Sequence, residues 1–147
     1  MRDSSSGFKN SVWFQVAPAV LYALLIFWLG SVEMPDGPEG PPMPSDKVMH
    51  LLAFGGMQLV VFRAVRWRWR RLGLVAQLIR AAALAAGLGA LLELYQAFLP
   101  YRSCDVADWV ADVIGVALAS GLIALLTRAV GGNALVASEP IEPPSRR

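Results

Sequence analysis

The sequence predicts an all-α membrane protein, a polytopic bundle of four transmembrane helices. Hydrophobic residues make up 56% of the 147 residues and charged residues only 16%. A soluble domain is typically about 45–50% apolar and about 25% charged. The apolar residues also form four blocks of roughly the 20 residues that a helix needs to cross a bilayer. We therefore expect the lipid bilayer to be the environment of this chain.

The first predicted span covers residues 12–29 and follows a short tail, residues 1–11. It differs from a signal peptide because its apolar stretch is too long and no small-residue cleavage site follows it. Pro18 lies inside the span, where a membrane helix tolerates proline. A loop rich in proline, glycine and acidic residues, 33–45, comes next.

The other three predicted spans cover residues 48–65, 78–99 and 106–126. Ser45 or Asp46 is suited to cap the start of the second span, and Pro100 follows the end of the third. The membrane domain thus extends over residues 12–127. Residues 128–147 are rich in proline, glutamate and serine, which predicts a disordered tail.

Positive charge gathers between the second and third spans and predicts the topology. The arginines of this region are Arg63, Arg66, Arg68, Arg70, Arg71 and Arg80. No soluble domain surrounds them, so we do not expect nucleic-acid binding. Arginine-rich loops of membrane proteins stay in the cytoplasm. Four spans then place both termini in the cytoplasm, and the acidic first loop and the third loop outside.

Glu93, Asp112 and His50 are ionisable residues that lie well inside the predicted spans. Glu93 lies six residues before the end of the third span, Asp112 six residues into the fourth, and His50 about one turn inside the second. Because consecutive spans run in opposite directions, these residues come to the same end of the bundle. A charged carboxylate in hydrocarbon costs about 2.5–3.5 kcal/mol. Glu93 and Asp112 must therefore be paired, protonated or hydrated from outside, and Arg102 and His50 are the available cationic partners.

Helical phase, 100° per residue, predicts that the polar residues of three spans face one another. The stripes are Asp46, His50, Ala53 and Met57 on the second span, Ala82, Ala86, Gly89, Glu93 and Gln96 on the third, and Asp105, Asp108, Asp112, Gly115 and Ala119 on the fourth. Small residues beneath the polar ones allow the helices to approach closely. The polar residues should therefore face the interior of the bundle.

Two interpretations fit this cluster: polar contacts that hold three helices together, or a ligand-binding site. The candidate ligand-binding residues are Asp46, Lys47, His50, Glu93, Gln96, Arg102, Asp105, Asp108 and Asp112.

Catalysis is the less favoured form of such a site. His50 would be the base or nucleophile, with Glu93 or Asp112 as its proton partner. No known catalytic motif supports a reaction. A metal-dependent form would use His50, Glu93, Asp108 and Asp112. Their spacing matches no standard metal motif, so we predict neither a metal nor another cofactor. The one cysteine, Cys104, forms no internal disulfide and is expected to be a small, semi-buried side chain.

Two sequence blocks resemble the VanZ-like family of bacterial membrane proteins. Residues 46–54, DKVMHLLAF, are similar to its D-K-x-x-H-x-x-x-F signature. The second block resembles its E-x-x-Q … P-x-R-x-x-D-x-x-D-x-x-x-N-x-x-G pattern, and its matching residues are Glu93, Gln96, Pro100, Arg102, Asp105, Asp108 and Gly115. One position departs from the pattern, because Asp112 stands where the family usually has asparagine.

The resemblance implies a multi-pass protein of the bacterial plasma membrane and cell envelope. The family is named for an accessory protein of resistance to glycopeptide antibiotics, especially teicoplanin. An outward polar site would then bind a lipid-linked wall precursor or an amphiphilic antibiotic. Arg102 would contact phosphate or carboxylate, and the acidic residues would contact amines or sugar hydroxyls. The alternatives are an outer-leaflet enzyme that uses His50, a small transporter, or a subunit of a larger complex, including a homo-oligomer.

Overall fold

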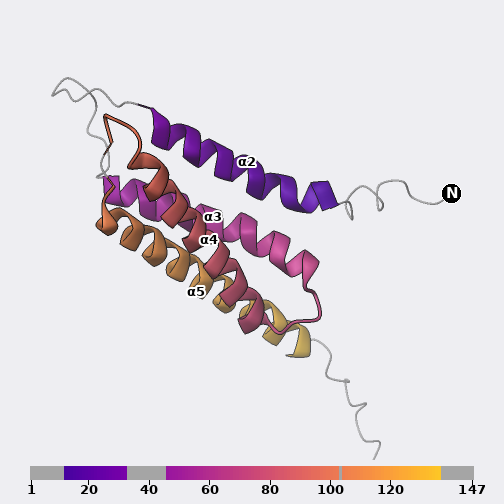
Figure 1. Ribbon diagram of the computed structural model, residues 1–147. Helices are drawn as coiled ribbons and strands as arrows, with labels where there is room; N and C mark the ends of the chain where they lie inside the picture. Colours follow the sequence, from indigo (N-terminus) through magenta and orange to yellow (C-terminus); the bar gives the residue numbers. More distant parts are fainter. Residues whose placement is uncertain (1–11, 33–45, 103, 137–147) are drawn as a thin grey trace, which may run out of the picture.

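The described residues form an antiparallel bundle of four helices (Figure 1). The computed structural model describes residues 12–32, 46–102 and 104–136, with 131–136 described by their backbone alone. The helices are α2 (Val12–Ser31), α3 (Asp46–Arg68), α4 (Leu74–Gln96) and α5 (Val106–Val136). All four are long and apolar enough to cross a membrane. A 23-residue helix is about 35 Å long, and the hydrocarbon layer is about 30 Å thick. The predicted all-α, four-span architecture is confirmed.

The α3 helix is longer than predicted at both ends, and charge explains its limits. It begins at Asp46, whose carboxylate lies in the first turn, and it ends with Arg66 and Arg68 in the last turn. Acidic groups at a helix start and basic groups at its end interact favourably with the helix dipole. The residue that starts the polar stripe of α3 is therefore also its first helical residue.

The boundaries of α4 and α5 are displaced from the predicted ones. The α4 helix covers residues 74–96, whereas the prediction was 78–99, because residues 97–101 form turns ahead of α5. The α5 helix continues to Val136, so the start of the predicted tail is helical. The predictions for residues 1–11, 33–45 and 137–147, including the possible cap at Ser45, fall outside the described residues.

The core of the bundle lies around α3, which packs most extensively against α5. Phe54, Met57 and Val65 of α3 are buried in it. The two helices come very close at Gly115 of α5, where an added Cβ atom would overlap the backbone of α3. The small residues of the predicted stripes therefore serve close helix packing, as expected within a membrane.

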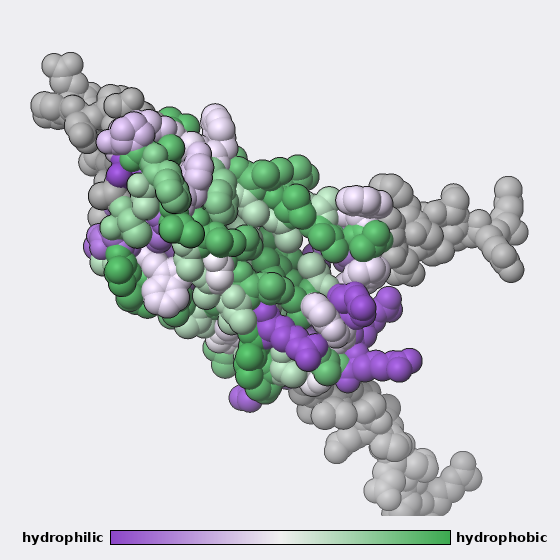
Figure 2. Space-filling view, viewed as in Figure 1, coloured by the Kyte–Doolittle hydropathy of each residue, from purple (hydrophilic) through white to green (hydrophobic). Residues whose placement is uncertain are grey.

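The α2 helix lies at the edge of the bundle against α3 and α4. Ile26 is its one buried residue, and the Tyr22 hydroxyl donates a 3.1 Å hydrogen bond to the Ala53 carbonyl of α3. Hydrophobic side chains dominate the visible middle of the molecule, while hydrophilic ones gather toward its ends (Figure 2). A soluble monomer rarely exposes so continuous an apolar surface, whereas lipid tails would cover it.

The two ends of the bundle differ in composition. The start of α2, the α3–α4 turn and the end of α5 lie together at one end (Figure 1), which we call the arginine end. There Arg63 Nη2 donates a 2.9 Å hydrogen bond to the Phe14 carbonyl, and the Arg80 guanidinium lies 5.3 Å from the Trp69 ring centroid. The start of α3, the end of α4 and the start of α5 form the opposite end, which we call the polar end.

Candidate functional site

Three ionisable side chains from three helices meet inside the polar end. We call His50 of α3, Glu93 of α4 and Asp112 of α5 the buried trio. Their exposed fractions are 8%, 4% and 0%. His50 Nδ1 lies 2.9 Å from Asp112 Oδ1, a hydrogen-bond distance, and 3.9 Å from Glu93 Oε1. The predicted convergence of the second, third and fourth spans is therefore present: His50 is within hydrogen-bond distance of Asp112 and within ion-pair distance of Glu93.

The backbone around the buried trio provides space and one hydrogen bond. A Cβ atom added to Gly89 of α4 would lie 2.6 Å from Asp112 Oδ2, so glycine is what leaves room for this carboxylate. Glu93 Oε2 accepts a 3.0 Å hydrogen bond from the Asp105 amide. Two other carboxylate oxygens, Glu93 Oε1 and Asp112 Oδ2, are buried and have no hydrogen-bond partner among the described residues. The trio is thus incompletely satisfied.

Lys47 joins α3 to the start of α5. Its Nζ lies 3.0 Å from Asp105 Oδ2 and 2.9 Å from Asp108 Oδ1. Asp105 also caps α5, because its Oδ1 accepts a 2.8 Å hydrogen bond from the Ala107 amide. This amide and then Lys47 lower the pKa of the Asp105 carboxyl, because both stabilise its charged form. Asp108 is buried.

Arg102 and Gln96 contact α2 instead of the buried trio. Arg102 Nη2 donates to the Val32 carbonyl at 3.2 Å, and Gln96 Nε2 donates to the Gly30 carbonyl at 3.4 Å. Among the described residues no ion pair joins Arg102 to Glu93 or Asp112. Of the two cations that the sequence offered, His50 is the one that pairs with these carboxyl groups in the structure. Turns formed by residues 97–101 carry Arg102 away from the trio and toward the end of α2.

Tyrosines not selected from the sequence complete the connection to α2. The Tyr101 hydroxyl donates to the Ser31 carbonyl at 2.8 Å, and the Tyr95 hydroxyl lies 2.9 Å from Ser31 Oγ. Tyrosine is common at membrane interfaces because its ring is apolar and its hydroxyl is polar. This preference, together with its position directly before Arg102, could have indicated Tyr101 from the sequence.

A pocket of about 80 Å³ lies between these elements at the polar end. Its apolar wall includes Ile26, Leu29 and Leu92. Its polar lining residues are Asp46, His50, Gln96 and Arg102. The pocket therefore places charged and hydrogen-bonding groups directly beside an apolar surface. The sequence did not indicate that α2 would form one of its walls.

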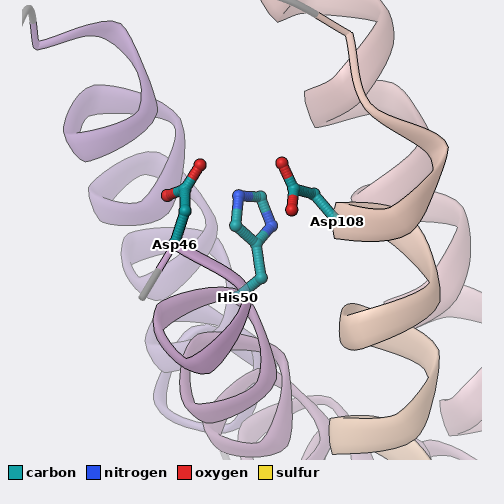
Figure 3. A group of neighbouring side chains, drawn as sticks. All are labelled: Asp46, His50 and Asp108. Atoms are coloured by element: carbon teal, nitrogen blue, oxygen red, sulfur yellow. The ribbon is translucent and has the colours of Figure 1, made fainter. Parts of the chain in front are cut away.

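His50 connects the pocket to the interior of the bundle. Its imidazole lies between the carboxylates of Asp46 and Asp108, and one ring nitrogen is on the side toward Asp46 (Figure 3). Nδ1 is held by Asp112. No hydrogen bond from a described residue reaches Nε2. The ring is thus fixed by one nitrogen while the other stays available.

Two groups of these side chains have a geometry that could hold a metal ion. One is the buried trio, and the other consists of Asp46, His50 and Asp108. Within each group, one ligand atom per residue lies within 4.8 Å of the others. The sequence suggested one metal site made of His50, Glu93, Asp108 and Asp112. In the structure these residues belong to two groups, and His50 is in both.

The lone cysteine is exposed, so the expectation of a semi-buried Cys104 was wrong. It lies in the connection between α4 and α5, where no helix packs over it.

Comparison with known proteins identifies the family of this chain. The sequence model of the VanZ/LLP1 family matches residues 6–127, which include all the described polar-end residues. Neither the curated proteins nor the solved structures give a match. The family match covers most of the chain and contains both sequence blocks that resemble the VanZ-like pattern. The chain therefore belongs to the VanZ/LLP1 family.

Proposed function

We propose that the polar end binds the head group of an amphiphilic envelope molecule, a lipid-linked wall precursor or a glycopeptide antibiotic. The observation that carries this proposal is the pocket between α2, α3 and α4, in which an apolar wall adjoins Arg102, His50 and Asp46. An amphiphile likewise combines an apolar tail with a polar head group. Its tail would lie against α2 and the lipid, and its head group would reach the charged residues.

The charges of the polar end suggest how a head group would be held. Among the described residues, Arg102 is hydrogen-bonded to one backbone carbonyl, that of Val32, so its guanidinium retains donors for phosphate or carboxylate. Asp46 is exposed beside it and would accept hydrogen bonds from amines or sugar hydroxyls. Lys47 is already bonded to Asp105 and Asp108, so it would contribute less to the ligand.

We also propose that the polar end faces the outside of a bacterial plasma membrane, with both termini in the cytoplasm. The support is the arginine end, because short basic connections between spans are retained in the cytoplasm. The α3–α4 turn carries Arg70 and Arg71, and the start of α2 and the end of α5 lie at the same end (Figure 1). A ligand in the outer leaflet would then reach the pocket directly.

Photo-crosslinking in living cells tests the ligand proposal. A crosslinking residue replaces Met49, which lines the pocket and is 41% exposed, and a matched probe replaces Leu59, which is 48% exposed in the middle of α3. We expect lipid-linked species or added teicoplanin to label position 49 more than position 59. Labelling only of protein at position 49 would overturn the proposal.

Removal of a guanidinium gives the quantitative test. We expect Arg102→Gln to reduce labelling at position 49 about tenfold, the effect of losing one hydrogen bond to a charged group. Arg71→Gln, at the arginine end, is the matched control and should leave labelling unchanged. If the ligand is a glycopeptide, expression of the protein should raise the inhibitory concentration of teicoplanin, and Arg102→Gln should cancel that increase.

A second candidate function is catalysis at the outer leaflet, favoured by the fixed orientation of His50. Asp112 holds Nδ1, so Nε2 could act as a base toward the pocket, with Glu93 as a nearby proton partner. Complementation of a deletion strain tests this candidate. We expect His50→Ala and Glu93→Ala to fail to complement if the protein is an enzyme, provided both variants reach the membrane at normal amounts. Full complementation by either variant would eliminate it.

A further inference from the structure

Unpartnered oxygen atoms in the buried trio point to a ligand that does not belong to the chain. Within the part of the chain that the structure describes, Glu93 Oε1 and Asp112 Oδ2 are both buried without a hydrogen-bond partner, in residues that are 4% and 0% exposed. A buried acceptor without a donor costs about 1–3 kcal/mol, and a charged one costs more. Proteins keep such groups where a water, an ion or a ligand satisfies them.

The distances within the trio suit a metal ion. Three ligand atoms bound to one ion at about 2.0–2.2 Å, with near-tetrahedral angles, lie about 3.3–3.6 Å from one another. His50 Nδ1 lies 2.9 Å from Asp112 Oδ1 and 3.9 Å from Glu93 Oε1, on either side of that value. One ligand atom from each of the three residues lies within 4.8 Å of the others, so small rotations of the side chains would bring the histidine nitrogen and one oxygen of each carboxylate around one ion.

The surrounding charges favour a dication. The trio contains two carboxyl groups and one imidazole, and no lysine or arginine of the described residues forms an ion pair with it. Lys47 is bonded to Asp105 and Asp108, and Arg102 to the Val32 carbonyl. A dication would balance the two carboxylates while the imidazole stays neutral and donates its lone pair.

We propose that His50, Glu93 and Asp112 form a binding site for a divalent transition-metal ion such as Zn²⁺ or Mn²⁺. One imidazole nitrogen and two carboxylates suit these ions better than Mg²⁺ or Ca²⁺, which prefer oxygen ligands alone. The trio offers no thiolate, so it does not suit Cu⁺. Three protein ligands leave a coordination position for water or another ligand, as in catalytic zinc sites.

The buried trio is a better site than the group of Asp46, His50 and Asp108. Asp108 is engaged by Lys47 at 2.9 Å, so a cation there would have to displace an ammonium. Asp46 is exposed to solvent. The unpartnered oxygens belong to Glu93 and Asp112, and neither residue is in that second group. The metal site does not depend on the proposed binding of an amphiphile.

Direct metal binding tests the proposal. The full chain, purified in detergent and stripped with a chelator, is dialysed against Zn²⁺ or Mn²⁺, and bound metal is measured by mass spectrometry. We expect about one ion per chain, as one three-ligand site requires, and little uptake of Mg²⁺ at the same concentration. Absence of saturable Zn²⁺ and Mn²⁺ binding would overturn the proposal and would indicate that the trio holds protons or water alone.

Isosteric variants locate the ion. We expect Glu93→Gln and Asp112→Asn each to weaken binding more than tenfold, because loss of even an outer-shell partner costs about 10–100-fold. Asp46→Asn, one turn from His50, is the matched control and should retain the wild-type affinity. If Asp46→Asn and Asp108→Asn abolish binding while Glu93→Gln does not, the second group is the site and the proposal is wrong.

A second measurement separates loss of the metal from loss of the fold. An ion that binds only the folded chain raises its thermal midpoint. We expect Zn²⁺ to raise the midpoint of the wild-type protein and of Asp46→Asn, and to leave that of Asp112→Asn unchanged. Circular dichroism of the metal-free variants shows whether they are helical. An equal rise in the wild type and in helical Asp112→Asn would contradict the site.

Discussion

Asp112 can be fully buried because the residue opposite it on α4 is Gly89. A Cβ atom at position 89 would lie 2.6 Å from Asp112 Oδ2, while a Cβ atom at Gly87, two residues earlier, would meet nothing within 4 Å. We expect Gly89→Ala to lower the free energy of unfolding by about 1–3 kcal/mol, the usual cost of overpacking. Gly87→Ala should raise it by up to about 1 kcal/mol, because alanine favours helix.

Unfolding in mixed detergent and dodecyl sulfate micelles, followed by circular dichroism, measures both variants. The pair is informative because the two substitutions are chemically identical and lie on one helix. Equal stability of the two variants would mean that Gly89 does not provide the space for Asp112.

Asp105 gives a prediction about pH. The Ala107 amide and Lys47 lower the pKa of its carboxyl, so its charged form stabilises the folded state above the ordinary carboxyl pKa of about 3.9. That contribution is lost as the pH falls through the lowered folded pKa. We expect Asp105→Asn to be less stable than the wild type at neutral pH, and the two stability curves to converge below about pH 4.

Asparagine is a suitable control for the helix cap at this position. It caps helices about as well as aspartate, so the substitution removes the charge and keeps the hydrogen bond to the Ala107 amide. A constant difference between the two curves from pH 7 down to the acid limit would contradict an electrostatic contribution from Asp105.

At the scale of elements, the contact of α3 with α5 depends on Gly115. An added Cβ atom there would overlap the Leu51 carbonyl oxygen, and backbone atoms cannot move aside as a side chain can. We expect Gly115→Ala to lower the free energy of unfolding by about 3 kcal/mol, at the upper end of overpacking costs. Gly121→Ala, on the same helix with nothing near it, should be neutral or slightly stabilising.

The same glycine also affects the site. Because α3 carries His50 and α5 carries Asp112, separation of the two helices should lengthen their 2.9 Å contact. Titration of the His50 ring by nuclear magnetic resonance in the two variants measures this effect. A His50 titration curve in Gly115→Ala that matches that of Gly121→Ala would show that the contact survives the change in packing.

Helical phase correctly predicted that His50, Glu93 and Asp112 face the interior, because a 3.6-residue period fixes the faces of each span. Asp46, on the same stripe as His50, is nevertheless exposed, because it is the first residue of α3. Helical phase could not identify the partners of the buried residues. Arg102 and His50 were equally available to Glu93 and Asp112, and only the turns of residues 97–101 direct Arg102 to the Val32 carbonyl. Such turns follow local backbone geometry, which a periodic pattern does not contain.

At the scale of the whole molecule, the architecture was predictable and the arrangement of the helices was not. The bilayer sets the length and the hydropathy that a transmembrane helix needs. The four apolar blocks of the sequence have both, and they correctly predicted four spans. Neighbouring helices are chosen by detailed packing, such as Tyr22 against the Ala53 carbonyl. The position of α2 beside α3 and α4, and hence the pocket, therefore could not be derived from the sequence.

The orientation of the whole molecule can be tested with its own cysteine. Cys104 is the only cysteine of the chain and is exposed at the polar end. If that end faces outward, a membrane-impermeant maleimide added to intact cells should label Cys104 to the same extent before and after permeabilisation. A Cys104→Ser variant with Arg71→Cys, at the arginine end, should be labelled only after permeabilisation. The reverse pattern would place the polar end in the cytoplasm, and the pocket would then be closed to ligands of the outer leaflet.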